Sequence, residues 1–430
     1  MIYSDLILRG DQWQRLTAAY VNDRLAHAYL FYGPPGSGKE AHAIELAALL
    51  NCQTLRPFDY AQGRQAQGDA LSKDQGETLR QAQGDTLTQA VDGACGVCPA
   101  CRKVQVLQHP NIQIVVPLPR RNQVEAGDPP LKALKPADIT NLTDQLAAKA
   151  TDPYFHIGLE GANTILINSV RELRRTAYLK PGEAGWRAVL IFQAERLGYP
   201  HSEAANALLK LLEEPPAETV FVLVTHRPHL LLDTIRSRCL GLYFPPLTTA
   251  QAADYLARRF DLTDEDARAL AQVSGGDLTK ARSLAQLDGS PLAAIDELAT
   301  SLLAPKPTGW QQTVNDLAQL RRREAQAFHT RMQLLALWLR DLMVLGQGGA
   351  GSGNGLLFGS RKAELQRQLE GHPTADWGAA AAAVEQAQNL LERNVQPTLV
   401  LTNMILDVRE AISRQSSAVS GQPEPHPSTP

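Results

Sequence analysis

The order of apolar and polar positions divides the chain into an alternating first half and a helical second half. Residues 28–32, 188–192 and 220–224 are short, nearly continuous apolar runs, as expected of strands buried on both faces of a parallel sheet. Residues 40–50 and 202–213 have apolar side chains at helical spacing. Strands that alternate with helices predict a layered α/β fold for this half.

Strand signals largely stop after Pro245 and Pro246. Residues 247–289 show short helical patterns and predict a small helical domain, and residues 290–413 are helical in pattern throughout. One apolar stripe in the second segment has the spacing of helix-packing core, namely Leu335, Trp338, Leu339 and Leu342. Residues 414–430 are rich in proline and predict a disordered tail.

Residues 53–91 interrupt the first half with a different composition. The stretch QAQGDAL at residues 65–71 recurs as QAQGDTL at residues 81–87. Because this segment has few large apolar side chains, it cannot form much core, and we expect a disordered insertion.

Length, charge and hydropathy narrow the class of protein. At roughly 150 residues per domain, 430 residues suggest about three domains. The 42 basic and 45 acidic side chains give a net charge of −3, which excludes coating of nucleic acid by bulk positive charge but allows a local patch. No apolar stretch approaches the roughly 20 residues of a membrane helix, and the first residues lack a signal-peptide pattern. We therefore expect a cytoplasmic protein without membrane contact.

Residues 33–39 (GPPGSGK) match the G-x-x-x-x-G-K part of a Walker A phosphate loop. Backbone N–H groups of such a loop and of the following helix cradle phosphates, and the lysine neutralises their charge. The apolar run before the loop and the helical pattern after it fit this role. The candidate nucleotide-binding residues are Gly33, Gly36, Gly38 and Lys39.

The residues that would hold magnesium are replaced. The position after the loop lysine, where a Ser or Thr hydroxyl binds Mg²⁺, is Glu40, whose carboxylate would be repelled by a polyphosphate. The strand at 188–192 should end in an acidic pair that holds the metal and orients water. It leads instead into Phe192 and Gln193, and Glu195 is out of register. This pattern favours a nucleotide fold that has lost its magnesium chemistry, and nucleotide binding without hydrolysis stays open.

Four of the five cysteines could form one metal site. Cys95, Cys98 and Cys101 follow a Cys-x-x-Cys-x-x-Cys pattern, and Cys52 can supply the fourth ligand of a tetrahedral zinc ion. The long connection between Cys52 and Cys95 is tolerable because the cost of loop closure grows only logarithmically with length. We expect a structural zinc site, and the alternative is four unconnected reduced thiols. Cys239 belongs to a different motif.

Several motifs resemble those of the bacterial DNA polymerase III clamp-loader subunits. They are HAYLF at residues 27–31, the four cysteines followed by His109-Pro110, VREL at 170–173, AANALLKLLEEPP at 204–216 and TIRSRC at 234–239. The resemblance implies an α/β AAA+ P-loop domain over residues 1–246 with an inserted zinc module (52–101), a small helical lid over 247–289 and an all-α collar for oligomerisation over 290–413.

The family offers two main assignments. Gamma/tau subunits resemble this chain but are ATPases with intact Walker elements, whereas the delta-prime branch does not hydrolyse ATP and lends an arginine to its neighbour. Glu40, Phe192 and Gln193 depart from the ATPase pattern, and Thr279 stands where the ATPases carry a sensor-2 arginine, although Arg282 is nearby. The resemblance thus implies a delta-prime-like subunit without intrinsic ATPase. The alternatives are a gamma/tau-type ATPase with an atypical P-loop and a zinc-containing nucleic-acid-binding protein with a vestigial P-loop.

Arg238 gains a role from the resemblance. In the Ser-Arg-Cys motif at 237–239 it would act in trans as an arginine finger on ATP bound by the adjacent gamma subunit, a contribution worth about 10³–10⁵ in rate. The alternative is a structural arginine that pairs with a local carboxylate. The implied partners are gamma/tau and delta subunits in a hetero-pentameric ring, together with the sliding clamp and primed DNA.

Overall fold

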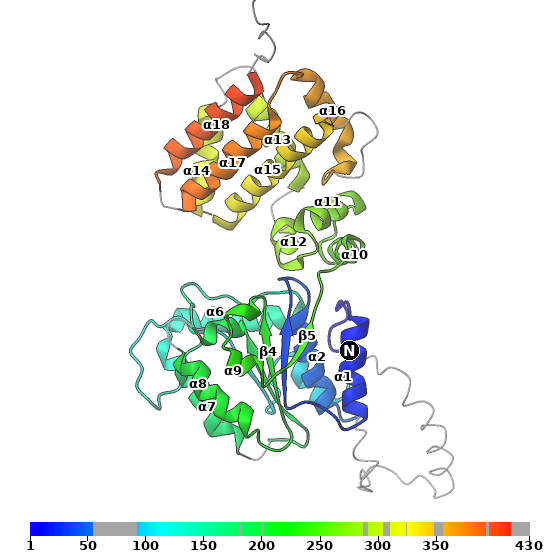
Figure 1. The fold of residues 1–430 in the computed structure, drawn as a ribbon, viewed down its shortest axis with the longest axis vertical. Helices are drawn as coiled ribbons and strands as arrows, with labels where there is room; N and C mark the ends of the chain where they lie inside the picture. The colour runs from blue at the N-terminus through cyan, green and yellow to red at the C-terminus, as the bar shows by residue number, and fades with distance from the viewer. Residues whose placement is uncertain are drawn as a thin grey trace, which may run out of the picture. The chain divides into compact units, whose positions relative to one another are not determined.

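The computed structural model describes residues 1–54, 93–179, 182–198, 202–286, 291–303, 310–323, 325–347, 356–392 and 395–413. The predicted insertion, from residue 55 onward, and the predicted tail lie outside these residues. The chain divides into two compact units, Met1–Leu247 and Thr248–Pro430, and each is described by itself (Figure 1).

A parallel sheet forms the centre of the first unit. Its strands are β1 (Ala28–Tyr32), β2 (Ile112–Val115), β3 (Arg187–Phe192), β4 (Thr219–Thr225) and β5 (Leu240–Tyr243). They are hydrogen-bonded in the order β2-β3-β4-β1-β5, and each neighbouring pair is parallel. The three predicted apolar runs are the inner strands β1, β3 and β4. The predicted α/β fold with a parallel sheet is therefore confirmed.

The carboxyl ends of β1, β3 and β4 meet at one edge of the sheet. Tyr32 at the end of β1 pairs with Thr225 at the end of β4. Phe192 at the end of β3 pairs with Val224, the residue before Thr225. The phosphate loop therefore begins beside the end of β4, and Gln193 follows β3 at the same edge. In sheets of this kind, ligands bind beyond the carboxyl ends of the strands, where the strand order reverses.

Helices cover both faces of this sheet. They are α1 (Gly10–Val21), α2 (Lys39–Asn51), α5 (Pro99–Gln105), α6 (Pro136–Thr151), α7 (Ile167–Ala177), α8 (Glu203–Glu213) and α9 (Asp233–Arg236), with the 3₁₀ turns η1 (Pro130–Ala133), η2 (Ala194–Leu197) and η3 (Pro228–Leu230). Val170 and Leu173 of α7 and Leu208 of α8 meet buried side chains of β1, β3 and β4 in one apolar cluster. Helices α1 and α2 lie on the other side of the sheet (Figure 1).

Helix α2, which follows the phosphate loop, is buried almost all round. Each of its residues except Glu40 is buried. Its central carboxylate, Glu45, accepts hydrogen bonds from the backbone N–H groups of Ile2 and Ala94, each at 3.0 Å. A buried polar group requires such partners. These bonds fix both the N-terminal segment and the start of the cysteine-rich segment against α2.

The second unit is helical throughout its described residues. The helices are α10 (Thr249–Phe260), α11 (Asp264–Ser274), α12 (Leu278–Ala285), α13 (Pro291–Leu303), α14 (Trp310–Arg323), α15 (Ala325–Gln347), α16 (Lys362–Gly371), α17 (Trp377–Glu392) and α18 (Pro397–Ser413), with the turn η6 (Gly359–Arg361). Thr248 and Gln251 form a capping box that starts α10. Gly275, at φ +62°, ends α11 in the left-handed conformation that glycine favours.

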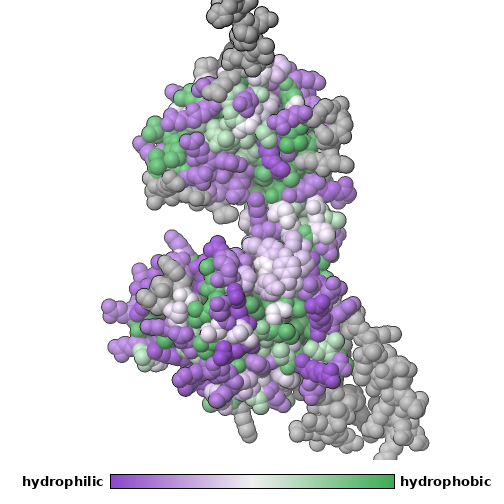
Figure 2. Space-filling model, in the orientation of Figure 1, coloured by the Kyte–Doolittle hydropathy of each residue, from purple (hydrophilic) through white to green (hydrophobic). Residues whose placement is uncertain are grey.

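The visible face of each unit mixes hydrophilic and hydrophobic residues (Figure 2). Many large apolar side chains are instead inside, and the predicted stripe of α15 from Leu335 to Leu342 is confirmed as buried core. Among the described helices, none combines the length and the apolar character that a membrane crossing requires.

Candidate functional site

The phosphate loop has a backbone that favours glycine at three positions. Gly33, Gly36 and Gly38 have φ values of +147°, +67° and +83°. A Cβ atom on Gly33 would overlap the backbone oxygen of Phe244, and one on Gly38 would lie 3.1 Å from the ring of Tyr154. Helix α2 then starts without a side-chain cap, which leaves its first N–H groups directed at the loop. The loop therefore has the build of a phosphate cradle.

Lys39 is buried at the start of α2 and is turned onto the loop itself. Its Nζ donates to the backbone oxygen of Pro34 at 2.6 Å and to Ser37 Oγ at 3.2 Å. The structure thus brings the four predicted nucleotide-binding residues together. Binding of a nucleotide by them stays a prediction.

Glu40, at the magnesium position, is paired with a buried lysine. Lys149 Nζ of α6 lies 2.7 Å from Glu40 Oε2, and its side chain is only 1 % exposed. His156 Nδ1 lies 3.5 Å from the other carboxylate oxygen, Oε1. Burial alone would raise the pKa of Glu40, but Lys149 and His156 lower it to about 2. The carboxylate is therefore charged and already engaged, whereas sequence reasoning considered only its repulsion by phosphate.

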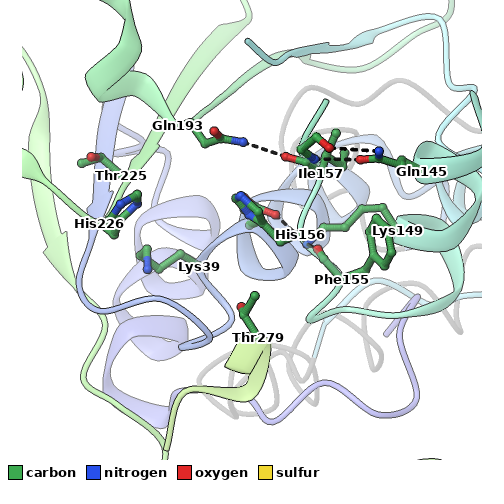
Figure 3. A network of polar contacts seen from close by, with 12 residues as sticks. Lys39, Gln145, Lys149, Phe155, His156, Ile157, Gln193, Thr225, His226 and Thr279 are labelled. Atoms are coloured by element: carbon green, nitrogen blue, oxygen red, sulfur yellow. Dashed lines mark hydrogen bonds and ion pairs between the residues drawn. The ribbon is translucent and has the colours of Figure 1, made fainter. Parts of the chain in front are cut away.

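The end of β3 supplies an aromatic ring and an amide in place of an acidic pair. Phe192 is fully buried, with its ring centroid 6.0 Å from Lys149 Nζ. Gln193 follows in a left-handed conformation at φ +53°, and its Nε2 donates to the backbone oxygen of Ile157 at 2.7 Å (Figure 3). The amide is thus bound to a segment of the chain beside the phosphate loop.

Glu195 is buried next to this edge with both carboxylate oxygens engaged. Thr225 Oγ1 donates to its Oε2 at 2.6 Å, and His226 Nδ1 lies 3.2 Å from its Oε1. Burial lowers the pKa of His226, Glu195 opposes this shift, and the charges of Arg227, Lys39 and His156 add to the lowering. In Figure 3, His226, Lys39 and His156 border the same space. Glu195 thus binds the last residue of β4 and the residue that follows it.

His42 connects the phosphate loop to the N-terminal segment. Its ring is fully buried and lies one helical turn after Gly38. The Nε2 atom accepts a hydrogen bond from the N–H of Arg9 at 3.1 Å, so Nδ1 carries the proton that is donated to the Gly38 oxygen at 2.8 Å. Burial lowers the pKa of His42 to about 4. A neutral imidazole therefore holds the loop's last glycine in place.

The four predicted cysteines come together at the end of α2. Cys52 caps α2, Cys98 caps α5 and Cys101 lies within α5. The four Sγ atoms lie within 4.8 Å of one another, and those of Cys95 and Cys101 are 3.8 Å apart. The sulfurs of Cys95 and Cys98 also accept backbone N–H groups, each at 3.4 Å. This set of sulfur ligands could bind a metal ion.

Cys239, the fifth cysteine, stands apart from this set. It follows α9 and packs against the apolar cluster under α7 and α8. Burial raises the pKa of its thiol to about 11. A neutral thiol of this kind behaves as a small apolar side chain.

Arg238 lies just after α9 and is about one-third exposed. Its guanidinium pairs with Glu213 Oε1, at the end of α8, at 2.7 Å, and it also donates to the backbone oxygen of Thr234 at 2.7 Å. The local carboxylate pair that sequence reasoning named as an alternative is thus present. Ion pairs between exposed groups contribute about 0–1 kcal/mol, so this pair can exchange for another anion at low cost.

The first unit matches a known family. The family model described as "DNA polymerase III, delta subunit" matches residues 9–67 and 67–248. The "DNA polymerase III subunit delta'" of Pseudomonas aeruginosa is 31 % identical over 284 residues, which cover 66 % of this chain and 59 % of that protein. The protein of the same name from Escherichia coli is 27 % identical over 344 residues, or 80 % of this chain and 77 % of that protein.

A more distant match is the "DNA polymerase III subunit gamma/tau" of Mycobacterium tuberculosis. It is 26 % identical over 223 residues, which cover 52 % of this chain and 25 % of that protein. The chain therefore spans a quarter of the gamma/tau protein but well over half of both delta' proteins. Because the family model matches more than half of the chain, the chain belongs to the DNA polymerase III delta-subunit family and is delta-prime-like.

Proposed function

We propose that the chain is the delta-prime-like subunit of a DNA polymerase III clamp loader, an AAA+ subunit that does not hydrolyse ATP and assists hydrolysis by a neighbour. Membership of the family and the phosphate-loop fold of the first unit support this proposal. The proposed partners are gamma/tau and delta subunits in a five-membered ring that loads a sliding clamp on primed DNA. A net charge of −3 suits a subunit that shares DNA contact with its neighbours.

The pairing of Glu40 with Lys149 carries the proposal that ATP is not hydrolysed. A P-loop ATPase needs a hydroxyl on Mg²⁺ after the loop lysine and acidic residues near the metal and the attacking water. Here a carboxylate bound to an internal ammonium occupies the first position, and Phe192 and Gln193 occupy the second. The first position thus lacks the hydroxyl, and the second lacks the acidic pair.

ATP turnover by the purified full-length chain tests this proposal. We expect phosphate release no faster than that of the Lys39→Ala variant. Because the residues that would hold magnesium are already missing, removal of the loop lysine has no ATPase activity left to abolish. Phosphate release is measured with ATP and Mg²⁺ at millimolar concentration. Turnover that Lys39→Ala abolishes would overturn the proposal and would favour a gamma/tau-type ATPase.

Arg238 is the proposed arginine finger. Its support is the Ser-Arg-Cys motif, its exposure and the weakness of its present ion pair with Glu213. A planar guanidinium makes two parallel hydrogen bonds to a phosphate as readily as to a carboxylate. The proposed step is therefore an exchange of Glu213 for the γ-phosphate held by the adjacent gamma subunit.

Zinc is the proposed metal of the cysteine cluster. Four thiolates fit the ligand preference and the tetrahedral geometry of structural zinc, and the N–H donors to Cys95 and Cys98 suit sulfurs that carry negative charge. When bound, zinc would link the end of α2 to α5 and leave no open ligand position. The role we propose for it is structural.

A further inference from the structure

Residues 152–158, which we call the strap, lead from the end of α6 past the phosphate loop. The hydroxyl of Tyr154 accepts a hydrogen bond from the N–H of Ile7 at 3.1 Å, and its ring lies against Gly38. At the other end, the N–H of Gly158 donates to Gln145 Oε1 at 2.7 Å, and the Gly158 oxygen accepts from Gln145 Nε2 at 3.1 Å. The strap is thus held against the phosphate loop near its first end and against α6 at its last residue.

Between these ends, the strap is bound at the two positions that lack magnesium chemistry. Lys149, which pairs with Glu40, also donates to the backbone oxygens of Pro153 at 3.0 Å and Phe155 at 2.8 Å. Gln193 donates to the backbone oxygen of Ile157 at 2.7 Å (Figure 3). One short segment therefore contacts both substituted positions. Gln193 bonds it directly, and Glu40 reaches it through Lys149 and through His156, whose Nδ1 lies 3.5 Å from Glu40 Oε1.

The ammonium of Lys149 has no proton left for a ligand. Its three N–H donors match three acceptors, namely Glu40 Oε2 and the oxygens of Pro153 and Phe155. The side chain is almost fully buried, so water does not screen it. A fixed positive charge at hydrogen-bond distance from the carboxylate repels a dication that approaches the same carboxylate.

We propose that the strap closes the magnesium position of the phosphate loop, with Glu40 (through Lys149 and His156) and Gln193 as its two anchors. Glu40 and Gln193 then do more than replace catalytic groups, because each makes a contact that holds the strap in place. This inference rests on the proposed absence of ATP hydrolysis and supplies its structural cause. In the alternative, both residues merely lack the catalytic groups and have no structural role. The protection of the strap amides from exchange would then not depend on Glu40 or Gln193.

Hydrogen–deuterium exchange of the full-length chain tests the anchors. The reporting amides are those of Tyr154, Phe155 and Gly158, whose N–H groups are bonded to Asp152 and Gln145. We expect Gln193→Ala to raise their exchange rates about tenfold, because it removes the bond to the Ile157 oxygen. We expect about the same factor for Glu40→Gln, because it removes the negative charge that holds Lys149 and His156, and about a hundredfold for the double variant.

Gln113→Ala is the matched control. Gln113 lies on the adjacent strand β2 and donates to Thr176 Oγ1 at 3.0 Å, so the variant also loses a hydrogen bond from a glutamine amide, but away from the strap. We expect wild-type strap exchange in this variant. Unchanged exchange in Gln193→Ala or Glu40→Gln, or an equal rise in Gln113→Ala, would overturn the anchoring.

A second arm compares strap exchange of the wild-type chain in ATP with Mg²⁺ and in ATP with EDTA. We expect the same rates, because the magnesium position is closed. A magnesium-dependent change would overturn the inference. The two experiments separate the proposed function from this inference. ATP turnover by the chain would contradict the proposed absence of hydrolysis and is measured independently of the exchange rates. Strap amides that do not respond to either substitution would contradict the anchoring, even if the chain shows no turnover.

Discussion

We expect Arg238→Ala to lower ATP turnover by about 10³-fold or more at the neighbouring site that we propose it serves in the reconstituted ring. An arginine finger stabilises charge that develops on the γ-phosphate, and fingers supplied in trans contribute about 10³–10⁵ in rate. The fold should be unaffected, because the residue's present bonds to Glu213 and Thr234 are at the surface. The measurement is single-turnover ATP hydrolysis by rings that contain either form of the chain, with their thermal unfolding as a check on folding.

Arg236→Ala is the matched control for this experiment. Arg236 is two residues away at the end of α9, is somewhat more exposed, and also pairs with a carboxylate, that of Asp233 at 2.8 Å. It should leave turnover at the wild-type level. Arg238→Lys should recover little, because an ammonium lacks the planar fork of donors. Normal turnover in Arg238→Ala, or a similar loss in Arg236→Ala, would be incompatible with the finger.

We expect Cys98→Ser to abolish binding of the zinc ion that we propose for the cysteine cluster. Wild-type chain should carry about one zinc ion, and the variant should carry almost none, because tetrahedral structural sites need all four ligands. Structural zinc sites in isolated peptides have apparent binding free energies of about 10–16 kcal/mol at pH 7. Loss of the zinc ion should therefore raise the hydrogen-exchange rates of the α5 amides. Elemental analysis and hydrogen–deuterium exchange measure the two effects.

Cys239→Ser controls for the loss of a cysteine elsewhere in the chain. Cys239 is about as small and as uncharged as the serine that replaces it, and it lies outside the cluster. This variant should keep its zinc and its α5 protection. Zinc-free wild-type protein, or full zinc content in Cys98→Ser, would disprove the metal assignment.

The inner strands of the sheet are predictable because burial on both faces leaves a continuous apolar run. β3 and β4 are buried along their whole length, and β1 is buried except at Tyr32. The edge strands give no such run. β2 is mostly half-buried, and β5 exposes all of its residues except Leu242, so their sequences resemble those of loops.

In the candidate site, too, the sequence predicts the parts that depend on local spacing and misses the contacts between distant residues. The phosphate loop and three of the cysteines have fixed spacing within a few residues, so the sequence alone locates them. The partner of Glu40 is 109 residues away, in a helix whose other residues are mostly exposed or half-buried. Nothing in the local pattern distinguishes Lys149 from a solvated lysine. The bond from Gln193 to the Ile157 oxygen depends only on where the backbone passes, and no pattern of side chains in the sequence predicts it.

Native mass spectrometry of the co-expressed subunits tests the central claim most directly. The chain would be expressed with gamma/tau and delta subunits of the same source and purified through a tag on delta. Membership of the ring predicts a five-membered complex that contains one copy of this chain. A complex of gamma/tau and delta that assembles fully without the chain, with the chain recovered on its own, would contradict the claim.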